Sequence, residues 1–245
     1  RVKRIVGGYV APGEFYTYIV GIRHLDNHTK KMSHHCGGSL ISPQFVLTAA
    51  HCLEADRNPK NYDIVAGDWD TTETEGTEQQ MKVAALHFYP KYQQKQKTLT
   101  HDIAIIELVT PLDLTEFVTT ISLPSSEFDY FNGRLCSIQG WGATEEGESP
   151  TTRLQAAQVV MFDRIRCTRL AGDKENLSRF NFCAGYAQGG IDTCQGDSGG
   201  PVVCQENDGI TYLTGITSWG IGCGRKNHLG VYTKVAKYLT WIGNV

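Results

Sequence analysis

The chain has 245 residues and a formal net charge of −3, with 40% hydrophobic and 20% charged residues. This balance excludes two classes of protein, because a nucleic-acid binder usually carries a basic face and a disordered chain has fewer apolar residues. No apolar run reaches the roughly 18 residues that span a bilayer, which argues against a membrane segment. The length suits one all-β domain or two smaller units.

Short runs rich in β-branched and aromatic residues recur between turn signals, which predicts an all-β fold. In chain order the runs are Tyr18–Arg23, Gly38–Ile41, Phe45–Thr48, Tyr62–Ala66, Met81–His87, Ile103–Leu108, Leu135–Gln139, Leu154–Phe162, Pro201–Cys204, Tyr212–Trp219 and Gly230–Thr233. About half lie before Ser122, so two packed β-units of similar size are expected. Val235, Tyr238, Leu239 and Ile242 follow the i, i+3, i+4, i+7 pattern of an apolar helix face and predict a terminal helix.

Eight cysteines, with no C-x-x-C pair and no zinc-like spacing, indicate disulfides and therefore an oxidising compartment. The sequons at Asn27 and Asn176 agree with a secreted, extracellular glycoprotein, although such tripeptides also arise by chance. The sequence starts at Arg1 without an initiator Met, so any signal peptide is expected to have been removed or left out.

Ser198 lies in the run Gly-Asp-Ser-Gly-Gly-Pro. Glycines let the chain turn sharply and bring backbone N–H groups close to a reacting carbonyl, so the serine is a candidate nucleophile. The run also matches the G-x-S-x-G turn of α/β-hydrolases, in which the acid and the histidine follow the serine. Only one histidine, His228, follows Ser198, and strand–helix alternation is absent, which argues against that fold.

Two further motifs supply partners for this serine. His51 follows an apolar run in Leu-Thr-Ala-Ala-His-Cys, and Asp102 heads the apolar run Asp-Ile-Ala-Ile-Ile. Taken alone, each residue is more simply a structural one, a core histidine or a strand-start acid. Together they provide a base, an orienting acid and a nucleophile in the order His, Asp, Ser.

These motifs, with Ser-Trp-Gly at Ser218–Gly220 and Ile-Val-Gly-Gly at Ile5–Gly8, resemble the chymotrypsin/trypsin family of serine endopeptidases over nearly the whole chain. The resemblance implies two packed six-stranded antiparallel β-barrels, at about 16–120 and 121–233, and a C-terminal helix at about 234–244. It implies that His51 takes the proton of Ser198 while Asp102 orients the imidazole. The N–H groups of Gly196 and Ser198 would form the oxyanion hole, and no cofactor is required for catalysis.

The resemblance also places Asp192 at the floor of the specificity pocket. A buried carboxylate in a glycine-lined slot favours a cationic side chain, so cleavage after Arg or Lys is expected. If the acid only faced solvent, cleavage after apolar residues would be expected instead. The pocket and the adjoining subsites would be formed by Thr193, Gln195, Ser218, Trp219, Gly220, Gly230 and Leu99.

In this family the mature enzyme starts at the residue that matches Ile5, so residues 1–4 are expected to be a pro-segment and residues 5–245 the peptidase domain. Cleavage after Arg4, by the enzyme itself or a similar protease, would free an ammonium on Ile5 that pairs with Asp197. In related zymogens that aspartate rests on a histidine and a serine. His34 matches the histidine but Gly21 replaces the serine, so the zymogen is expected to be slightly active.

An acidic loop between Gly67 and Gly76 resembles the calcium loop of trypsins. Oxygen ligands in a flexible loop suit Ca²⁺, although a solvated loop without an ion explains the composition equally well. The implied ligands are carboxylates of Asp68, Glu75 and Glu78 and carbonyls of Asp70 and Glu73. By contrast, the cluster of His24, His28, His34 and His35 has no carboxylate pattern of a catalytic zinc site, and surface or structural roles are expected.

The family pattern implies four disulfides: Cys36–Cys52, Cys136–Cys204, Cys167–Cys183 and Cys194–Cys223. Expected partners are protein or peptide substrates, an activating protease and protein protease inhibitors, with no nucleic acid or membrane, and the chain is expected to be a monomer. The alternative is a protease homologue that binds partners with little or no turnover. The presence of all three triad residues argues against it.

Overall fold

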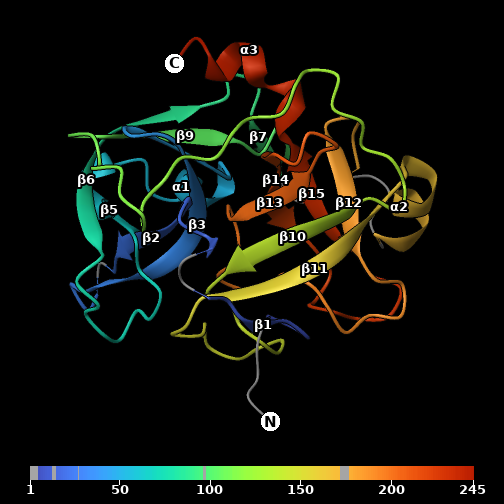
Figure 1. Ribbon diagram of the computed structural model, residues 1–245, viewed down its shortest axis with the longest axis horizontal. Helices are drawn as coiled ribbons and strands as arrows, with labels where there is room; N and C mark the ends of the chain where they lie inside the picture. The colour runs from blue at the N-terminus through green and yellow to red at the C-terminus, as the bar shows by residue number, and fades with distance from the viewer. Residues whose placement is uncertain (1–4, 13–14, 27, 96–97, 172–176) are drawn as a thin grey trace.

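The computed structural model describes residues 5–12, 15–26, 28–95, 98–171 and 177–245, and it contains two barrels that lie side by side (Figure 1). The first barrel is closed by antiparallel pairing in the order β2-β3-β4-β9-β6-β5. Its strands are β2 (Ile19–Leu25), β3 (Met32–Ser42), β4 (Phe45–Thr48), β5 (Tyr62–Ala66), β6 (Gln79–Phe88) and β9 (Ala104–Leu108). Closure leaves no free sheet edge in this unit.

The second barrel follows the order β11-β10-β13-β14-β15-β12, and pairing of β12 with β11 closes it. Its strands are β10 (Leu135–Gly140), β11 (Gln155–Phe162), β12 (Asn181–Gly185), β13 (Pro201–Gln205), β14 (Thr211–Trp219) and β15 (Gly230–Lys234). The all-β fold of two six-stranded antiparallel barrels is therefore confirmed.

Each end of the described chain leaves the barrel formed by its neighbouring strands and packs against the other barrel. β1 (Tyr9–Val10) extends the sheet of the second barrel by pairing with Gln155 and Ala156 of β11. The last residues instead pack on the first barrel, where Val235 and Tyr238 belong to its buried core. Each barrel therefore carries one end of the chain, which holds the pair together.

The terminal helix is shorter than the sequence predicts. A 3₁₀ turn, η3 (Val235–Lys237), precedes a four-residue helix, α3 (Leu239–Ile242), and Tyr238 between them has φ −124° and ψ 5°. The break fits the packing of the Tyr238 ring, which makes edge contacts with Tyr89 and His101. Side-chain packing overrides the apolar periodicity at this point.

Four further short elements connect the barrels' strands. They are α1 (His51–Glu54), η2 (Pro59–Asn61), α2 (Arg164–Leu170) and the hairpin of β7 (Gln93–Lys95) and β8 (Thr98–Thr100). None of the helices in the described segments is long and apolar enough to cross a membrane.

Four disulfides join the same cysteine pairs that the resemblance implies. Cys36–Cys52 links β3 to α1, Cys136–Cys204 joins neighbouring strands of the second barrel, and Cys167–Cys183 ties α2 to β12. Cys194–Cys223 joins two loops of the second barrel. No described cysteine is free.

Candidate active site

His51 and Asp102 meet because their strands are neighbours. β4 and β9 pair with Thr48 opposite Ala104, so the residues that follow β4 and those that precede β9 emerge at the same end of the barrel. Asp102 is fully buried, and its carboxylate accepts hydrogen bonds from His51 Nδ1 at 2.8 Å and from the His51 backbone N–H at 2.9 Å. The imidazole is thereby fixed in one tautomer, with its proton on Nδ1.

The second barrel completes the surroundings of Asp102. Ser218 Oγ donates to Asp102 Oδ2 at 2.5 Å, and Thr233 Oγ1 donates to the Asp102 carbonyl at 2.9 Å. Burial lowers the pKa of His51, but the Asp102 charge and hydrogen bond outweigh burial, and the pKa of His51 is raised above its ordinary value. A proton accepted by this imidazole is therefore stabilised.

Ser198 lies on a loop that only glycine-rich sequence can form. Gly199 has φ +76°, and a Cβ there would lie 2.6 Å from the Gly37 carbonyl oxygen. The Gly37 N–H donates to the Ser198 carbonyl at 2.8 Å, which holds this loop of the second barrel against β3 of the first. The nucleophile is thus placed at the junction of the two barrels.

The structure brings Ser198 and His51 to this junction but does not join them directly. In the described part of the chain, no hydrogen bond links the Ser198 hydroxyl to His51 Nε2, which lies 3.9 Å from the Cys52 sulfur. Hydrogen bonds between catalytic groups often shorten only when substrate binds. Proton transfer requires the Ser198 hydroxyl and His51 Nε2 to come within hydrogen-bond distance.

Two backbone amides beside Ser198 are available to a ligand. Within the described segments, the N–H groups of Gly196 and Ser198 have no acceptor in the protein. Gly196 has φ +96°, and its carbonyl is held by His34 Nε2 at 2.9 Å. Burial lowers the pKa of His34, which favours the neutral ring. A neutral His34 that donates to this carbonyl holds the peptide that joins Gly196 to Asp197.

A pocket of about 140 Å³ opens beside Ser198. The residues expected from the sequence that line it are Asp192, Thr193, Gln195, Ser218, Trp219, Gly220 and Gly230. Four further residues also line it, namely Cys194, Thr217, Gly222 and Cys223. Leu99, which is expected at an adjoining subsite, lies on β8 outside this pocket.

Asp192 is 4% exposed, and its carboxylate accepts from the N–H groups of Thr193 at 2.9 Å and Gly224 at 3.0 Å. Burial raises its pKa to about 6. A Cβ on Gly230 would lie 2.7 Å from Asp192 Oδ1, so only glycine leaves this oxygen accessible from the pocket. The floor is therefore an anionic group at the end of a narrow slot.

The family model for trypsin matches residues 5–242. The chain belongs to the trypsin family. Its domain is accordingly that of a serine protease, a hydrolase that acts on protein substrates and is blocked by protein inhibitors. Residues 5–242 include all the loops of the candidate site described above.

In this trypsin-family chain, the segment that starts at Ile5 packs inside the second barrel. Ile5 is fully buried in the core of that barrel, and the Val6 carbonyl accepts from the Asp192 N–H at 3.3 Å. A Cβ on Gly224 would lie 3.3 Å from the Val6 Cβ, so the segment also contacts the loop that holds Asp192. Arg4, the residue before the expected cleavage point, lies outside the described residues.

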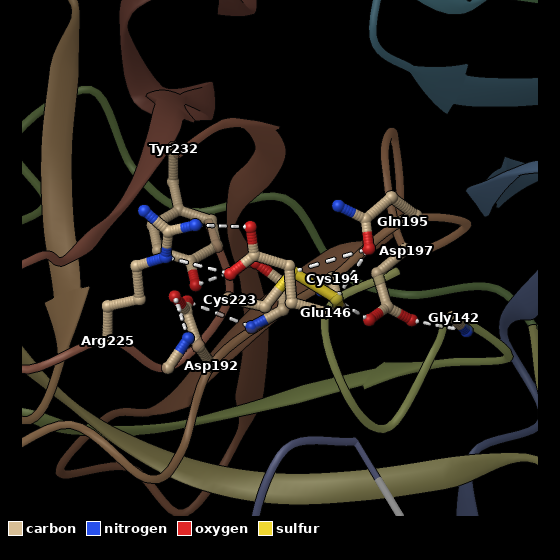
Figure 2. The surroundings of a disulfide bond; sticks show 11 residues. Gly142, Glu146, Asp192, Cys194, Gln195, Asp197, Cys223, Arg225 and Tyr232 are labelled. Atoms are coloured by element: carbon tan, nitrogen blue, oxygen red, sulfur yellow. Dashed lines mark hydrogen bonds and ion pairs between the residues drawn. A yellow bond between two sulfur atoms is a disulfide. The ribbon is translucent and has the colours of Figure 1, made fainter. Parts of the chain in front are cut away.

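Asp197 is 1% exposed and lies beside the disulfide Cys194–Cys223 (Figure 2). Its carboxylate accepts from the N–H groups of Gly142 at 2.8 Å and Cys194 at 2.9 Å, and burial raises its pKa to about 7. His34 contacts the carbonyl of Gly196 and not this carboxylate. No described Lys, Arg or His is ion-paired with Asp197, so its charge is solvated by amides alone.

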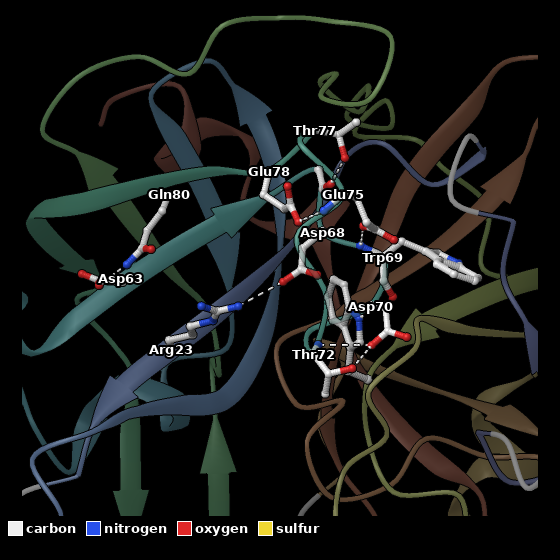
Figure 3. Close-up of polar contacts among 12 residues, drawn as sticks. Arg23, Asp63, Asp68, Trp69, Asp70, Thr72, Glu75, Thr77, Glu78 and Gln80 are labelled. Atoms are coloured by element: carbon white, nitrogen blue, oxygen red, sulfur yellow. Dashed lines mark hydrogen bonds and ion pairs between the residues drawn. The ribbon is translucent and has the colours of Figure 1, made fainter.

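The acidic loop of the first barrel gathers three carboxylates (Figure 3). Asp68 Oδ2 pairs with Arg23 at 3.1 Å, whereas Asp68 Oδ1 is buried without a partner. Burial, opposed by the charge of Arg23 and aided by the charges of Glu78 and Glu75, raises the pKa of Asp68 to about 6. A buried carboxylate oxygen beside two other acids fits the oxygen-ligand chemistry of Ca²⁺.

The other expected members of this loop have protein partners. The carbonyl of Asp70 accepts from the Glu73 N–H at 2.9 Å, and its carboxylate pairs with Arg153 at 2.9 Å. Oxygens of Glu75 and Glu78 accept from backbone N–H groups of the same loop. The loop is thus preformed, with the free oxygen on Asp68.

The clustered histidines have separate hydrogen-bond partners, although the ring centroids of His24 and His35 lie 5.3 Å apart. His24 Nε2 contacts Asp56 at 3.1 Å, and His35 Nε2 contacts the Cys52 carbonyl at 2.8 Å. One described group of three metal-binding side chains, Cys36, His51 and Cys52, includes the two sulfurs of a disulfide, which offer no thiolate. The sequons at Asn27 and Asn176 fall outside the described residues.

Several contacts at the site were not predicted from the sequence. Ser218 was expected to contact substrate, at the pocket and the adjoining subsites, yet its hydroxyl also binds Asp102, and Thr233 was not selected at all. Glu146 and Arg225 form an ion pair over the pocket. No local motif identifies these residues, because each one contacts a partner that is far away in the sequence.

Proposed function

We propose that this protein is a serine endopeptidase that cleaves after Arg or Lys and is made as a zymogen. The observation that carries the proposal is the buried Asp192 at the end of the pocket beside Ser198. An opposite charge about 4 Å from it is worth roughly 4 kcal/mol at an effective dielectric of about 20, before desolvation. A lysine or arginine side chain in the pocket would neutralise the Asp192 carboxylate, which otherwise has only backbone N–H partners.

Catalysis follows the general scheme of Ser-His-Asp proteases. His51 Nε2 takes the proton of the Ser198 hydroxyl as its oxygen attacks the peptide carbonyl. Asp102 holds the imidazole and stabilises the cation formed on it. The free N–H groups of Gly196 and Ser198 donate to the oxyanion of the tetrahedral intermediate. His51 then gives its proton to the leaving amine, and water hydrolyses the acyl-enzyme by the same path in reverse.

Activation is proposed to act through Asp197. Cleavage between Arg4 and Ile5 creates an ammonium at the start of a segment that already packs next to the pocket. A buried carboxylate is stabilised by a cation partner, and Asp197 has none among the described residues. The ammonium of Ile5 would meet this need and fix the peptide between Gly196 and Ser198.

Calcium is proposed as a structural ion and has no role in the chemical steps. Asp68, Glu75 and Glu78 would hold it through their carboxylates, and the carbonyls of Asp70 and Glu73 would complete the set. The ion would stabilise a loop that contacts the segment 151–154 of the second barrel through the Thr71 and Leu154 N–H groups.

The four disulfides and the family favour a secreted, extracellular protein. The alternative function, a homologue that binds partners without turnover, is favoured by no feature of the site. The lack of a hydrogen bond between Ser198 and His51 is consistent with an enzyme that has no substrate bound.

Covalent labelling tests the proposal. The cleaved chain is treated with two peptide phosphonates that differ only in carrying an arginine-like or a phenylalanine-like group, and the adduct is located by mass spectrometry. We expect the arginine-like reagent to label Ser198 and the Ser198→Ala variant to remain unlabelled. Faster labelling by the phenylalanine-like reagent would contradict the specificity, and no labelling by either would favour the binding homologue.

A further inference from the structure

Glu146 and Arg225 form an ion pair close to Asp192 and the disulfide Cys194–Cys223 (Figure 2). Glu146 comes from the loop 144–152, and Arg225 comes from the loop between β14 and β15. The contact is bidentate, with Arg225 Nε 2.8 Å from Glu146 Oε2 and Arg225 Nη2 2.6 Å from Glu146 Oε1. Two parallel hydrogen bonds fix the relative orientation of the two loops more firmly than a single contact would.

This ion pair lies directly against the pocket wall. A Cβ on Gly222, which lines the pocket, would lie 2.7 Å from Glu146 Oε2 and 2.6 Å from Arg225 Cδ. The hydrogen bond from Arg225 lowers the pKa of Glu146. Glu146 therefore contacts the segment 222–225 at more than one point.

The inner side of the same segment holds the pocket floor. The Gly224 N–H donates to Asp192 Oδ2 at 3.0 Å, and the Gly224 carbonyl accepts from the Gly190 N–H at 2.8 Å. Cys223, the preceding residue, is joined by its disulfide to Cys194. A shift of this short segment would thus displace a hydrogen bond to the carboxylate that is proposed to bind the substrate cation.

We propose that Glu146 and Arg225 are positioning residues for the specificity pocket: their ion pair holds the segment 222–225 so that the Gly224 N–H stays on Asp192. The inference rests on the proposed specificity for Arg or Lys. Both side chains are partly exposed, at 37% and 52%, and an isolated exposed ion pair adds little to global stability. Its loss should therefore change ligand binding in the pocket and leave the melting temperature unchanged.

Benzamidine, a small amidinium compound, serves as the probe of the pocket. In the cleaved enzyme, Glu146→Gln and Arg225→Gln should each raise the inhibition constant of benzamidine and the KM for an arginine substrate about fivefold. The value of kcat should stay within about twofold, since neither residue touches the reacting atoms. The charge-swapped double variant Glu146→Arg/Arg225→Glu should recover most of the lost affinity.

Glu206→Gln is the matched control, because Glu206 pairs with Arg134 on the same barrel and does not line the pocket. It should leave benzamidine binding unchanged. Raising the salt concentration from about 0.05 to about 0.5 M should reduce the difference between the parent and Glu146→Gln, since salt screens the pair.

Unchanged benzamidine binding in Glu146→Gln would overturn the inference, as would an equal loss in Glu206→Gln or a double variant no better than the singles. If the parent enzyme itself fails to bind benzamidine, the proposed specificity fails and the inference fails with it. If the parent enzyme and Glu146→Gln bind benzamidine equally tightly, the inference is overturned but the proposed specificity stands.

Discussion

The first barrel carries His51 and Asp102 next to regular strands, whereas the second barrel carries Ser198, Asp192 and Gly196 on loops. Asp102 is held by two hydrogen bonds from His51, and β4 and β9 set the spacing between the two residues. In the second barrel, glycines with φ between 62° and 96° surround the site, namely Gly189, Gly190, Gly196, Gly199, Gly222 and Gly224.

The difference lies in what stabilises each half of the site. Strand pairing in the first barrel positions its half, and the second barrel adds the hydrogen bonds of Ser218 and Thr233 to Asp102. The second barrel builds its half around two buried carboxylates, Asp192 and Asp197, and around the segment that follows Ile5. We infer that cleavage at Ile5 controls the second half of the site and leaves the first half unchanged.

Asp102→Asn tests the first half and should have the largest effect. An asparagine keeps the shape but stabilises the wrong tautomer of His51, so kcat should fall about 10⁴-fold for every substrate. Benzamidine binding should remain, since the pocket is built by the other barrel. Steady-state kinetics together with inhibition constants check this, and a large loss of benzamidine affinity would contradict the division between the barrels.

Asp197→Asn tests the second half. Removal of one partner of a buried ion pair costs roughly 4 kcal/mol, so kcat/KM of the cleaved enzyme should fall about a thousandfold. Benzamidine binding should weaken with it, in contrast to Asp102→Asn. The same measurements apply, and the account is contradicted if this variant binds benzamidine as the parent does.

These contrasts also show what a sequence can and cannot reveal. The motifs around His51, Asp102 and Ser198 predicted the residues of the site because its chemistry requires them close to turns and strand ends. β12 was missed, since Asn181–Gly185 is short, contains Cys and Gly, and is buried along its whole length without alternation. Long-range contacts such as Ser218 with Asp102 depend on how the barrels dock, which no local pattern reports.

The pH dependence of benzamidine binding tests the buried floor of the pocket. Burial raises the pKa of Asp192 to about 6, so this carboxylate is charged above that pH and protonated below it. The inhibition constant should therefore rise about tenfold for each pH unit below about 6. The charge of Asp197, whose pKa burial raises to about 7, interacts with that of Asp192, whereas the Tyr232 hydroxyl, whose pKa burial raises well above its ordinary value, stays neutral in this pH range.

An inhibition constant that stays flat between about pH 7 and about pH 4.5 would contradict a cation site on Asp192. Binding of an uncharged aromatic ligand is the control, since protonation of the floor should not weaken it. Inhibitor binding is preferred to turnover because protonation of His51, whose pKa is raised, also lowers kcat as the pH falls.

Calcium removal should have the smallest effect. With free Ca²⁺ at about 100 times its dissociation constant, the ion would stabilise the fold by about 2.7 kcal/mol, which corresponds to roughly 5–10 °C in the melting temperature. Thermal denaturation with Ca²⁺ and with a chelator measures this shift. The shift should vanish in Glu78→Gln and persist in Glu127→Gln, which removes an exposed acid elsewhere.

The central claim is that the pocket beside Ser198 binds Arg or Lys and that cleavage between Arg4 and Ile5 stabilises this pocket through Asp197. The most direct test compares kcat/KM of the uncleaved and cleaved chain for matched peptides with Arg, Phe or Ala before the scissile bond. We predict weak activity before cleavage and, after it, a large increase for the Arg peptide with little for Phe or Ala. A preference for Phe, or equal Arg hydrolysis before and after cleavage, would contradict the account.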